Sequence, residues 1–249
     1  MPTTEIAILL DRSGSMQPRK ADHEGGLRSF VQDQRTLSGD VFLTFARFDS
    51  EEPFELVYDR APLATVEEEK LTLLPRGGTP LLEAASKLLT HLEAKVPLDH
   101  AVIVMVITDG QENQSAIEYT RQALKDRIEA CQRKGWIVLY LGANVDEFQE
   151  AGSLGIGQGQ TLGYTPGVMG VANMYYGMTA NVTHMRQQVN SGNMAGMGSA
   201  SAFTDDQRTA AKVEDHEKPR GSFKNMEKKI TPVEKSASDT TPAGTTEGA

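Results

Sequence analysis

The stretch AVIVMVITDG, residues 101–110, decides the fold class. Its first seven residues are apolar on both faces of an extended chain, which is typical of a central strand covered by helices on each side. The run is about a third of the roughly 20 residues that a membrane-spanning helix needs. Asp109 and Gly110 then end the strand in a turn.

Other segments repeat this alternation of strand and helix. Apolar runs predict strands at 5–10, 40–48, 54–59, 101–108 and 136–142. The second and third of these runs are expected to form a hairpin. A small edge strand is expected near 161–164. Helices are expected at 22–37, 79–95, 115–133 and 167–192. Together these elements predict an α/β three-layer sandwich, with a mostly parallel central sheet flanked by helices.

Local signals set the expected helix starts. Thr79 precedes Pro80 as a possible N-cap, and Ser115 with Glu118 forms a capping-box pattern. The last expected helix carries a seam whose spacing alternates between four and three residues. Its members are Val171, Tyr175, Met178, Val182, Met185 and Val189. The seam is compatible with a coiled coil, but its few positions favour ordinary packing against the sheet.

Composition limits the functional classes. The chain has 249 residues and a net charge of −9, which argues against unaided binding to nucleic acid or an anionic membrane. Its single cysteine, Cys131, excludes an internal disulfide, and the first residues do not resemble a signal peptide. We therefore expect a cytoplasmic protein.

The last quarter of the chain differs in composition. Residues 193–249 are rich in small and polar side chains and have almost no apolar periodicity. We expect a domain over 1–192, followed by a flexible low-complexity tail over 193–249 in which 221–230 is a candidate local binding segment.

Oxygen-bearing side chains collect where the predicted strands end. Asp11, Ser13 and Ser15 follow the first strand in DRSGSM, Asp109 follows the central strand, and Thr79 lies in RGGTP. The carboxyl ends of parallel strands meet at one edge of a sheet, so all five residues should lie together. Hard oxygen ligands without His or Cys suit Mg²⁺, with Mn²⁺ or Ca²⁺ as alternatives.

These three segments, in this order, resemble the metal-ion-dependent adhesion site (MIDAS) of von Willebrand factor A domains. The resemblance covers roughly residues 4–192, and LGANVDEFQEAGSLGI at 141–156 resembles small stand-alone A-domain proteins of bacteria and their phages. If the chain is phage-encoded, host cytoplasm or a virion would be its location.

The resemblance implies a role for each residue. Ser13 and Ser15 would bind the metal directly, Asp11 and Asp109 directly or through water, and Thr79 would join or leave the shell. A partner protein would supply an Asp or Glu to the sixth position. In such domains this event can be linked to movement of the last helix, here 167–192, although the glycine-rich route at 152–163 departs from a well-formed last strand.

Several alternatives stay open. Thr79 could only cap its helix, Asp49 could be a hairpin-turn residue or an acceptor near the site, and Glu112 and Asn113 could shape a partner surface or simply lead into a helix. The sequence predicts a binding module rather than an enzyme, because it shows no second activated group beside the carboxylates. The alternatives are a structural or assembly protein, possibly phage-associated, in which the metal is stabilising, and a metal-dependent hydrolase.

Overall fold

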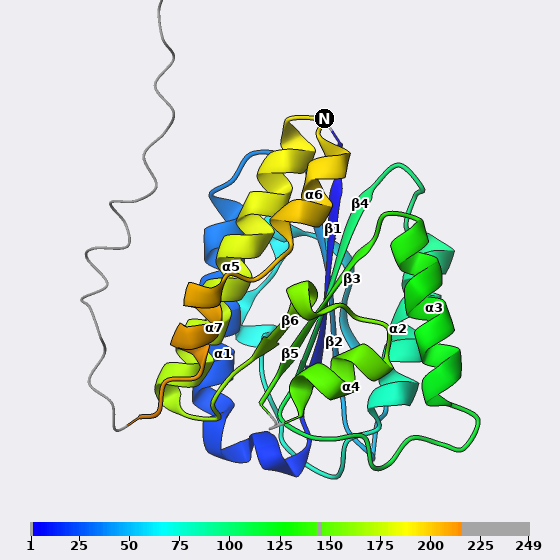
Figure 1. Ribbon diagram of the computed structural model, residues 1–249, viewed down its shortest axis with the longest axis vertical. Coiled ribbons are helices and arrows are strands. Elements are labelled where there is room, and N and C mark those ends of the chain that lie inside the picture. Colours follow the sequence, from blue (N-terminus) through cyan, green and yellow to red (C-terminus); the bar gives the residue numbers. More distant parts are fainter. Residues whose placement is uncertain (1, 144–145, 216–249) are drawn as a thin grey trace, which may run out of the picture. The chain divides into compact units, whose positions relative to one another are not determined.

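The computed structural model describes residues 2–143 and 146–215 and centres on a six-stranded sheet (Figure 1). Its strands are β1 (Thr4–Asp11), β2 (Val41–Phe48), β3 (Glu55–Pro62), β4 (Ala101–Thr108), β5 (Ile137–Gly142) and β6 (Thr161–Gly163), in the order β3-β2-β1-β4-β5-β6. Strand β3 runs antiparallel to β2, and the other neighbours are parallel. The predicted mostly parallel sheet, its hairpin and its small edge strand are confirmed.

Helices cover both faces of the sheet. They are α1 (Lys20–Arg35), α2 (Leu81–Lys95), α3 (Arg121–Arg133), α4 (Glu147–Ser153), α5 (Val168–Asn190), α6 (Met194–Ala200) and α7 (Asp205–Ala211). Figure 1 shows α1, α5, α6 and α7 on one side and α2, α3 and α4 on the other. The three-layer sandwich expected from the sequence is therefore confirmed.

The central strands divide their side chains between two cores. On β1, Ile6 and Ile8 join the core under α1 and α5, whereas Ala7 and Leu9 join the core under α2 and α3. Strand β4 alternates in the same way along its whole length, and all eight of its residues are buried. Burial on both faces explains why these strands read as continuous apolar runs.

The predicted seam of α5 packs inside the molecule. All six of its residues are buried and belong to the core that α5 shares with α1 and the sheet. Gly26 of α1 permits a close approach, because a Cβ there would lie 2.2 Å from the Tyr175 ring. The seam thus serves ordinary packing within the chain, as the sequence favoured.

The start of the expected flexible tail is folded, which corrects the prediction of a tail over 193–249. Helices α6 and α7 lie along α5, and Met197, Ala200, Phe203 and Ala211 are buried in its core. Thr204 and Gln207 form a capping box at α7. The apolar residues were too few and too widely spaced to give a helical period. Residues 216–249, which include the candidate binding segment 221–230, lie outside the described residues.

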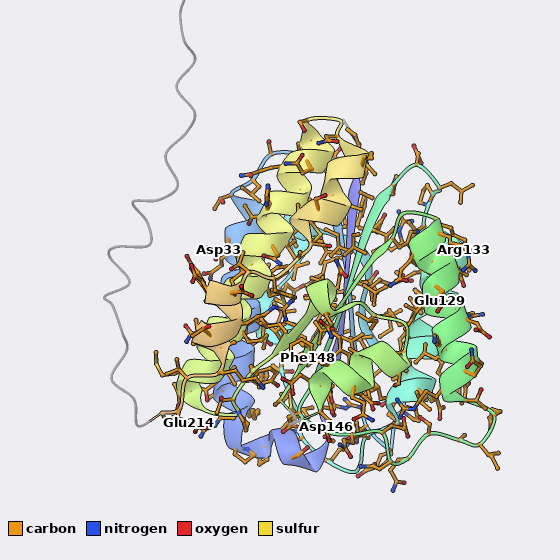
Figure 2. The ribbon with its side chains drawn as sticks, in the orientation of Figure 1. Asp33, Glu129, Arg133, Asp146, Phe148 and Glu214 are labelled. Carbon is orange, nitrogen blue, oxygen red and sulfur yellow. The ribbon has the colours of Figure 1, made fainter. Side chains whose placement is uncertain are left out.

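This folded extension (residues 191–215) also contacts the edge of the sheet at which β6 lies. The Arg208 guanidinium lies 5.4 Å from the ring centroid of Phe148 in α4 and donates to the carbonyl of Gln158 at 2.6 Å. Figure 2 labels Phe148 and Asp146 on the segment that follows β5. The chain therefore continues beyond α5 as part of the same folded unit.

Three helix starts differ from the prediction. A 3-10 turn, Gly14–Arg19, precedes α1, and α2 begins at Leu81. Helix α3 begins at Arg121 instead of 115, because Thr120 is its N-cap and accepts from the amide of Ala123.

Among the described residues, no helix combines the length and hydropathy that crossing a bilayer requires.

Candidate metal site

Strands β1 and β4 bring the first two acidic side chains together. Their parallel register pairs Leu10 with Ile107, so Asp11 lies beside Thr108 at the carboxyl edge of the sheet. The Thr108 hydroxyl donates to Oδ2 of Asp11 at 2.6 Å. Asp109 is the next residue, and the strand ends there. The sheet edge thus places both carboxylates as the sequence predicts.

The serine loop (residues 12–15) folds back over this edge. Its first turn is fixed by Asp11, whose Oδ1 accepts from the Ser13 amide at 2.7 Å. The Ser13 and Ser15 hydroxyl oxygens lie 2.9 Å apart, and Ser15 donates to Oδ1 of Asp109 at 2.6 Å. A continuous hydroxyl–carboxylate chain therefore joins the serine loop to the end of β4.

The threonine loop (residues 76–80) contributes the fifth side chain. Thr79 is 2% exposed. A Cβ at Gly110 would lie 2.7 Å from the Thr79 hydroxyl oxygen and 3.5 Å from Oδ2 of Asp11, which brings these two oxygens to the same small space. A Cβ there would displace the Thr79 hydroxyl, whereas its distance to Asp11 is an ordinary contact. The five predicted residues therefore lie near one another at the carboxyl edge of the sheet.

Thr79 does not cap α2, which corrects that alternative. The N-cap position is Pro80, and it makes no side-chain cap. The amides of Leu82 and Glu83 are instead satisfied by Glu112 and Ser115, at 2.8 and 3.0 Å. Both acceptors come from the aspartate loop (residues 109–115), which follows β4.

Asn113 completes this link between the two loops. Its side-chain oxygen accepts from the backbone amide of Thr79 at 2.9 Å, and its backbone amide donates to the Thr79 carbonyl at 3.1 Å. Glu112 and Asn113 thus hold the threonine loop and α2 in place. The predicted capping box of Ser115 and Glu118 is wrong, because the Ser115 side chain serves α2 and Glu112.

The two carboxyl groups are costly to ionise in this setting. Burial raises the pKa of Asp11 to about 6, although hydrogen bonds from Thr108 and Ser13 oppose the rise. Burial also raises the pKa of Asp109, against the opposing hydrogen bond from Ser15. A nearby cation would favour both ionised forms.

The donor set fits a hard divalent cation. Two carboxylates neutralise a dication, and three hydroxyls supply neutral oxygen ligands. Among the described residues, no group of three or more His, Cys, Asp or Glu is placed to hold a metal. The candidate site contains only two such residues and draws its other ligands from serine and threonine.

Other sequence candidates lie elsewhere. Cys131 is buried in α3, where burial raises the pKa of its thiol to about 11. Trp136 is buried in the core of the α2 and α3 face, as its packing interpretation predicts. Asp49 is fully buried and binds Arg12 and Arg76, two residues that sequence reasoning did not single out. Their only sequence signal is their position next to predicted ligands.

Solved structures with a similar fold include von Willebrand factor A domains. The chain is similar to the von Willebrand factor type A protein from Catenulispora acidiphila, with 17% identity and a TM-score of 0.56 over 74% of this chain and 43% of that one. It is also similar to the von Willebrand factor domain of the type V pili tip protein Mfa5 from Porphyromonas gingivalis, with 13% identity and a TM-score of 0.56 over 77% and 96% of the two chains.

A third similar structure is proximal thread matrix protein 1 from the mussel byssus with a zinc-occupied MIDAS motif. It shares 16% identity and a TM-score of 0.50, over 72% of this chain and 48% of that one. This chain thus spans less than half of the first and third of these proteins, and at 13–17% identity the likeness is one of fold. No protein-family model and no curated protein matches the sequence.

Proposed function

We propose that this chain, which has the fold of a von Willebrand factor A domain, is a divalent-metal-dependent protein-interaction module. The observation that carries the proposal is the convergence of five oxygen-bearing side chains from three loops: Asp11, Ser13, Ser15, Thr79 and Asp109. Mg²⁺ is the proposed ion, with Mn²⁺ or Ca²⁺ as alternatives, because all the donors are hard oxygens.

The side chains of the site have distinct proposed roles. Ser13 and Ser15 would offer hydroxyl ligands, and their mutual contact already holds both oxygens on the same side of the loop. Asp11 and Asp109 would supply the negative charge, directly or through water. Thr79, held by Asn113, would supply the ligand from the third loop. When bound, the metal would attract a carboxylate of a partner protein to an open position.

Binding is favoured over catalysis by the groups around the ligands. The described side chains that hydrogen-bond to the five residues are the hydroxyl of Thr108 and the amide of Asn113, in addition to bonds within the set. Neither is a general acid or base at neutral pH. A metal-dependent hydrolase would need such a group, so we propose that the chain is not an enzyme.

The solved structures support the coarse form of this proposal. One similar chain is a pilus tip protein, and another is a protein of the mussel byssus. The byssus protein was solved with zinc in its MIDAS motif. Proteins of pili and of the byssus therefore share this fold.

The first test is calorimetric titration with Mg²⁺ and with Mn²⁺. We expect the wild-type chain to bind one equivalent and Asp11→Ala to bind none while it keeps a folded circular-dichroism spectrum. Equal metal affinity in the two proteins would refute the assignment of the site. The buried Glu5→Gln variant, at the other end of the same strand, is the matched control and should bind normally.

The second test concerns the partner. The tagged chain would be used to capture proteins from a lysate of its source in Mg²⁺ and in EDTA, with Asp109→Ala as the control. Partners lost with chelator and in the variant support carboxylate recognition through the metal. Partners kept under all conditions favour the assembly role, in which the metal only stabilises the fold.

A further inference from the structure

The loops of the candidate site are tied to one another by backbone hydrogen bonds. The Arg76 amide donates to the Arg12 carbonyl at 2.8 Å, and the Gly14 amide donates to the Gly77 carbonyl at 3.1 Å. The serine loop therefore runs beside the threonine loop. Gly77 has a φ of 62°, a left-handed conformation that glycine adopts without strain.

A third segment, the hairpin turn between β2 and β3 (residues 49–54), lies against the threonine loop. The Ser50 amide donates to the Gly78 carbonyl at 3.1 Å, and the Gly78 amide donates to the Ser50 hydroxyl at 2.8 Å. A Cβ at Gly77 would meet that hydroxyl at 2.5 Å. The hairpin turn carries none of the five proposed ligands, yet it packs directly on a loop that does.

Asp49 is the side chain that connects all three segments. It is fully buried, and its Oδ1 accepts from the amides of Glu51 and Glu52 at 2.7 and 2.9 Å, which fixes the hairpin turn. Its Oδ2 accepts from Nε of Arg76 in the threonine loop at 3.0 Å and from Nε of Arg12 in the serine loop. One carboxylate thus holds an arginine from each of two ligand-bearing loops.

The charges in this cluster depend on one another. Arg12 is 2% exposed and also pairs with Glu55 and, at 3.6 Å, with Glu52. Arg76 is 40% exposed and pairs with Glu51 at 3.4 Å. Loss of the Asp49 charge would remove the counter-ion that the two arginines share and leave the buried Arg12 with Glu55 and the more distant Glu52, and removing a partner from a buried charge is unfavourable. The two loops would then shift relative to each other.

We propose that Asp49 is a positioning residue for metal binding, which sets the serine loop and the threonine loop in register through Arg12 and Arg76. The inference rests on the proposed function and assigns no metal contact to Asp49 itself. Arg12 lies between Asp11 and Ser13, and Arg76 lies three residues before Thr79, so a shift of either arginine moves a proposed ligand. Groups behind a metal's ligands commonly have this effect on affinity.

A purely structural role in the hairpin would need less. The two amide contacts to Oδ1 close the turn without help from Oδ2. The same hairpin contains a second ion cluster, in which Asp59 pairs with His91 at 2.7 Å and with Lys95. Within the part of the chain that the structure describes, that cluster contacts none of the ligand-bearing loops, so Asp59 provides a matched control.

The test compares Asp49→Asn with Asp59→Asn. Asparagine keeps the size of the side chain and an acceptor for the turn but removes the charge that the arginines share. Mn²⁺ affinity is measured by calorimetry well below the unfolding temperature, and thermal unfolding is measured in EDTA. We expect Asp49→Asn to bind Mn²⁺ roughly 10–100-fold more weakly than the wild type, the range seen for outer-shell substitutions, and Asp59→Asn to bind normally.

A second variant covers the case in which Asp49→Asn does not fold. Arg76→Met removes the half-exposed link between Asp49 and the threonine loop, together with the more exposed pairs of Arg76 with Glu51 and Glu52. It should weaken Mn²⁺ binding severalfold in the wild-type background, so it tests the positioning role without the Asp49→Asn protein. Where Asp49→Asn does fold, Arg76→Met should have a smaller effect in that background, because both changes break one link.

The outcomes separate this inference from the proposed function. If the wild type binds Mn²⁺ and Asp49→Asn loses only thermal stability, or if Arg76→Met binds normally, Asp49 does not position the site but the metal assignment stands. If the wild type itself binds no divalent ion, the positioning role and the proposed function are both wrong.

Discussion

Strand β1 carries a buried carboxylate near each end, and the two carboxylates differ in the charge of the groups that contact them. Glu5, 1% exposed, receives the guanidinium of Arg60 at 2.6 Å and the ring of His100 at 2.8 Å. Asp11, fully buried, accepts from neutral donors, the Thr108 hydroxyl and the Ser13 amide. Among the described residues, a cationic side chain therefore contacts the carboxylate at the amino end of the strand, and none contacts the carboxylate at the carboxyl end.

The difference separates a carboxylate with a fixed cationic partner from one that suits the proposed metal site. A buried charge is tolerated when a fixed partner compensates it, as Arg60 compensates Glu5. Asp11 lies in a space shared with hydroxyl oxygens and with Asp109, where burial keeps the pKa of Asp11 raised at about 6. A buried carboxyl group of this kind, with no cationic side chain in contact among the described residues, is suited to bind a cation from solution.

The largest expected effect comes from breaking the compensated end. Arg60→Met would leave Glu5 buried with only His100 beside it, and loss of one partner of a buried pair costs about 3 kcal/mol or more. Urea unfolding would measure this loss, and it should be the same in Mg²⁺ and in EDTA. A loss that Mg²⁺ restores would mean that the two ends of β1 are not independent.

A slightly smaller effect is expected from filling the uncompensated end. With free Mg²⁺ at a hundred times its dissociation constant, the folded state should gain about 2.7 kcal/mol, because only the folded chain assembles the site. Thermal unfolding with and without the ion measures the gain. Asp109→Asn should abolish it, and Glu5→Gln should keep it. Equal stabilisation of the Asp109 variant would place the ion elsewhere.

The contrast also explains what the sequence could and could not predict. Alternating strands and helices, and oxygen-bearing residues at strand ends, depend on local pattern, and so the sheet and the placement of these five residues at its carboxyl edge were predictable. Asp49 lies 37 positions from Arg12 and 27 positions from Arg76 in the sequence, and no local period links these residues. Only the fold shows that Asp49 is more than a hairpin-turn residue.

The folded extension was missed for a related reason. Met197 and Phe203 are buried because α5 and the sheet edge already offer a surface, whereas the small residues around them give no amphipathic pattern of their own. Tertiary packing decides such segments. The metal roles of the five residues and the cytoplasmic location stay predictions, because the fold does not test them.

A third buried ionisable group extends the comparison to a base. His23 in α1 is 1% exposed and contacts Tyr175, 3.3 Å from its hydroxyl, and the ring of Tyr164. Burial lowers the pKa of His23 to about 4, so the folded chain keeps the ring neutral. The unfolded chain takes up a proton below about pH 6.5, so stability from this group is complete above that pH and declines as the pH falls toward 4.

This group should make folding about 2 kcal/mol less favourable at pH 5 than at pH 8. His23→Phe keeps an aromatic ring among the tyrosines and should remove that part of the pH dependence, whatever its stability at pH 8. Urea unfolding of both proteins across this range provides the measurement. Identical pH profiles would show that His23 is protonated in the folded state and finds a compensating partner after all.

The smallest effect is expected at a compensated pair that is not buried. Lys95 and Asp59 are 47% and 35% exposed, and water already solvates both charges. Lys95→Met should change the free energy of unfolding by about 0.5 kcal/mol or less, and 0.5 M NaCl should reduce even that difference. Since Arg60→Met removes the same kind of charge from a buried pair on the same hairpin, the ratio of the two losses measures how much burial contributes. Comparable losses would mean that burial does not set the cost, and the contrast between Glu5 and Asp11 would then lose its physical basis.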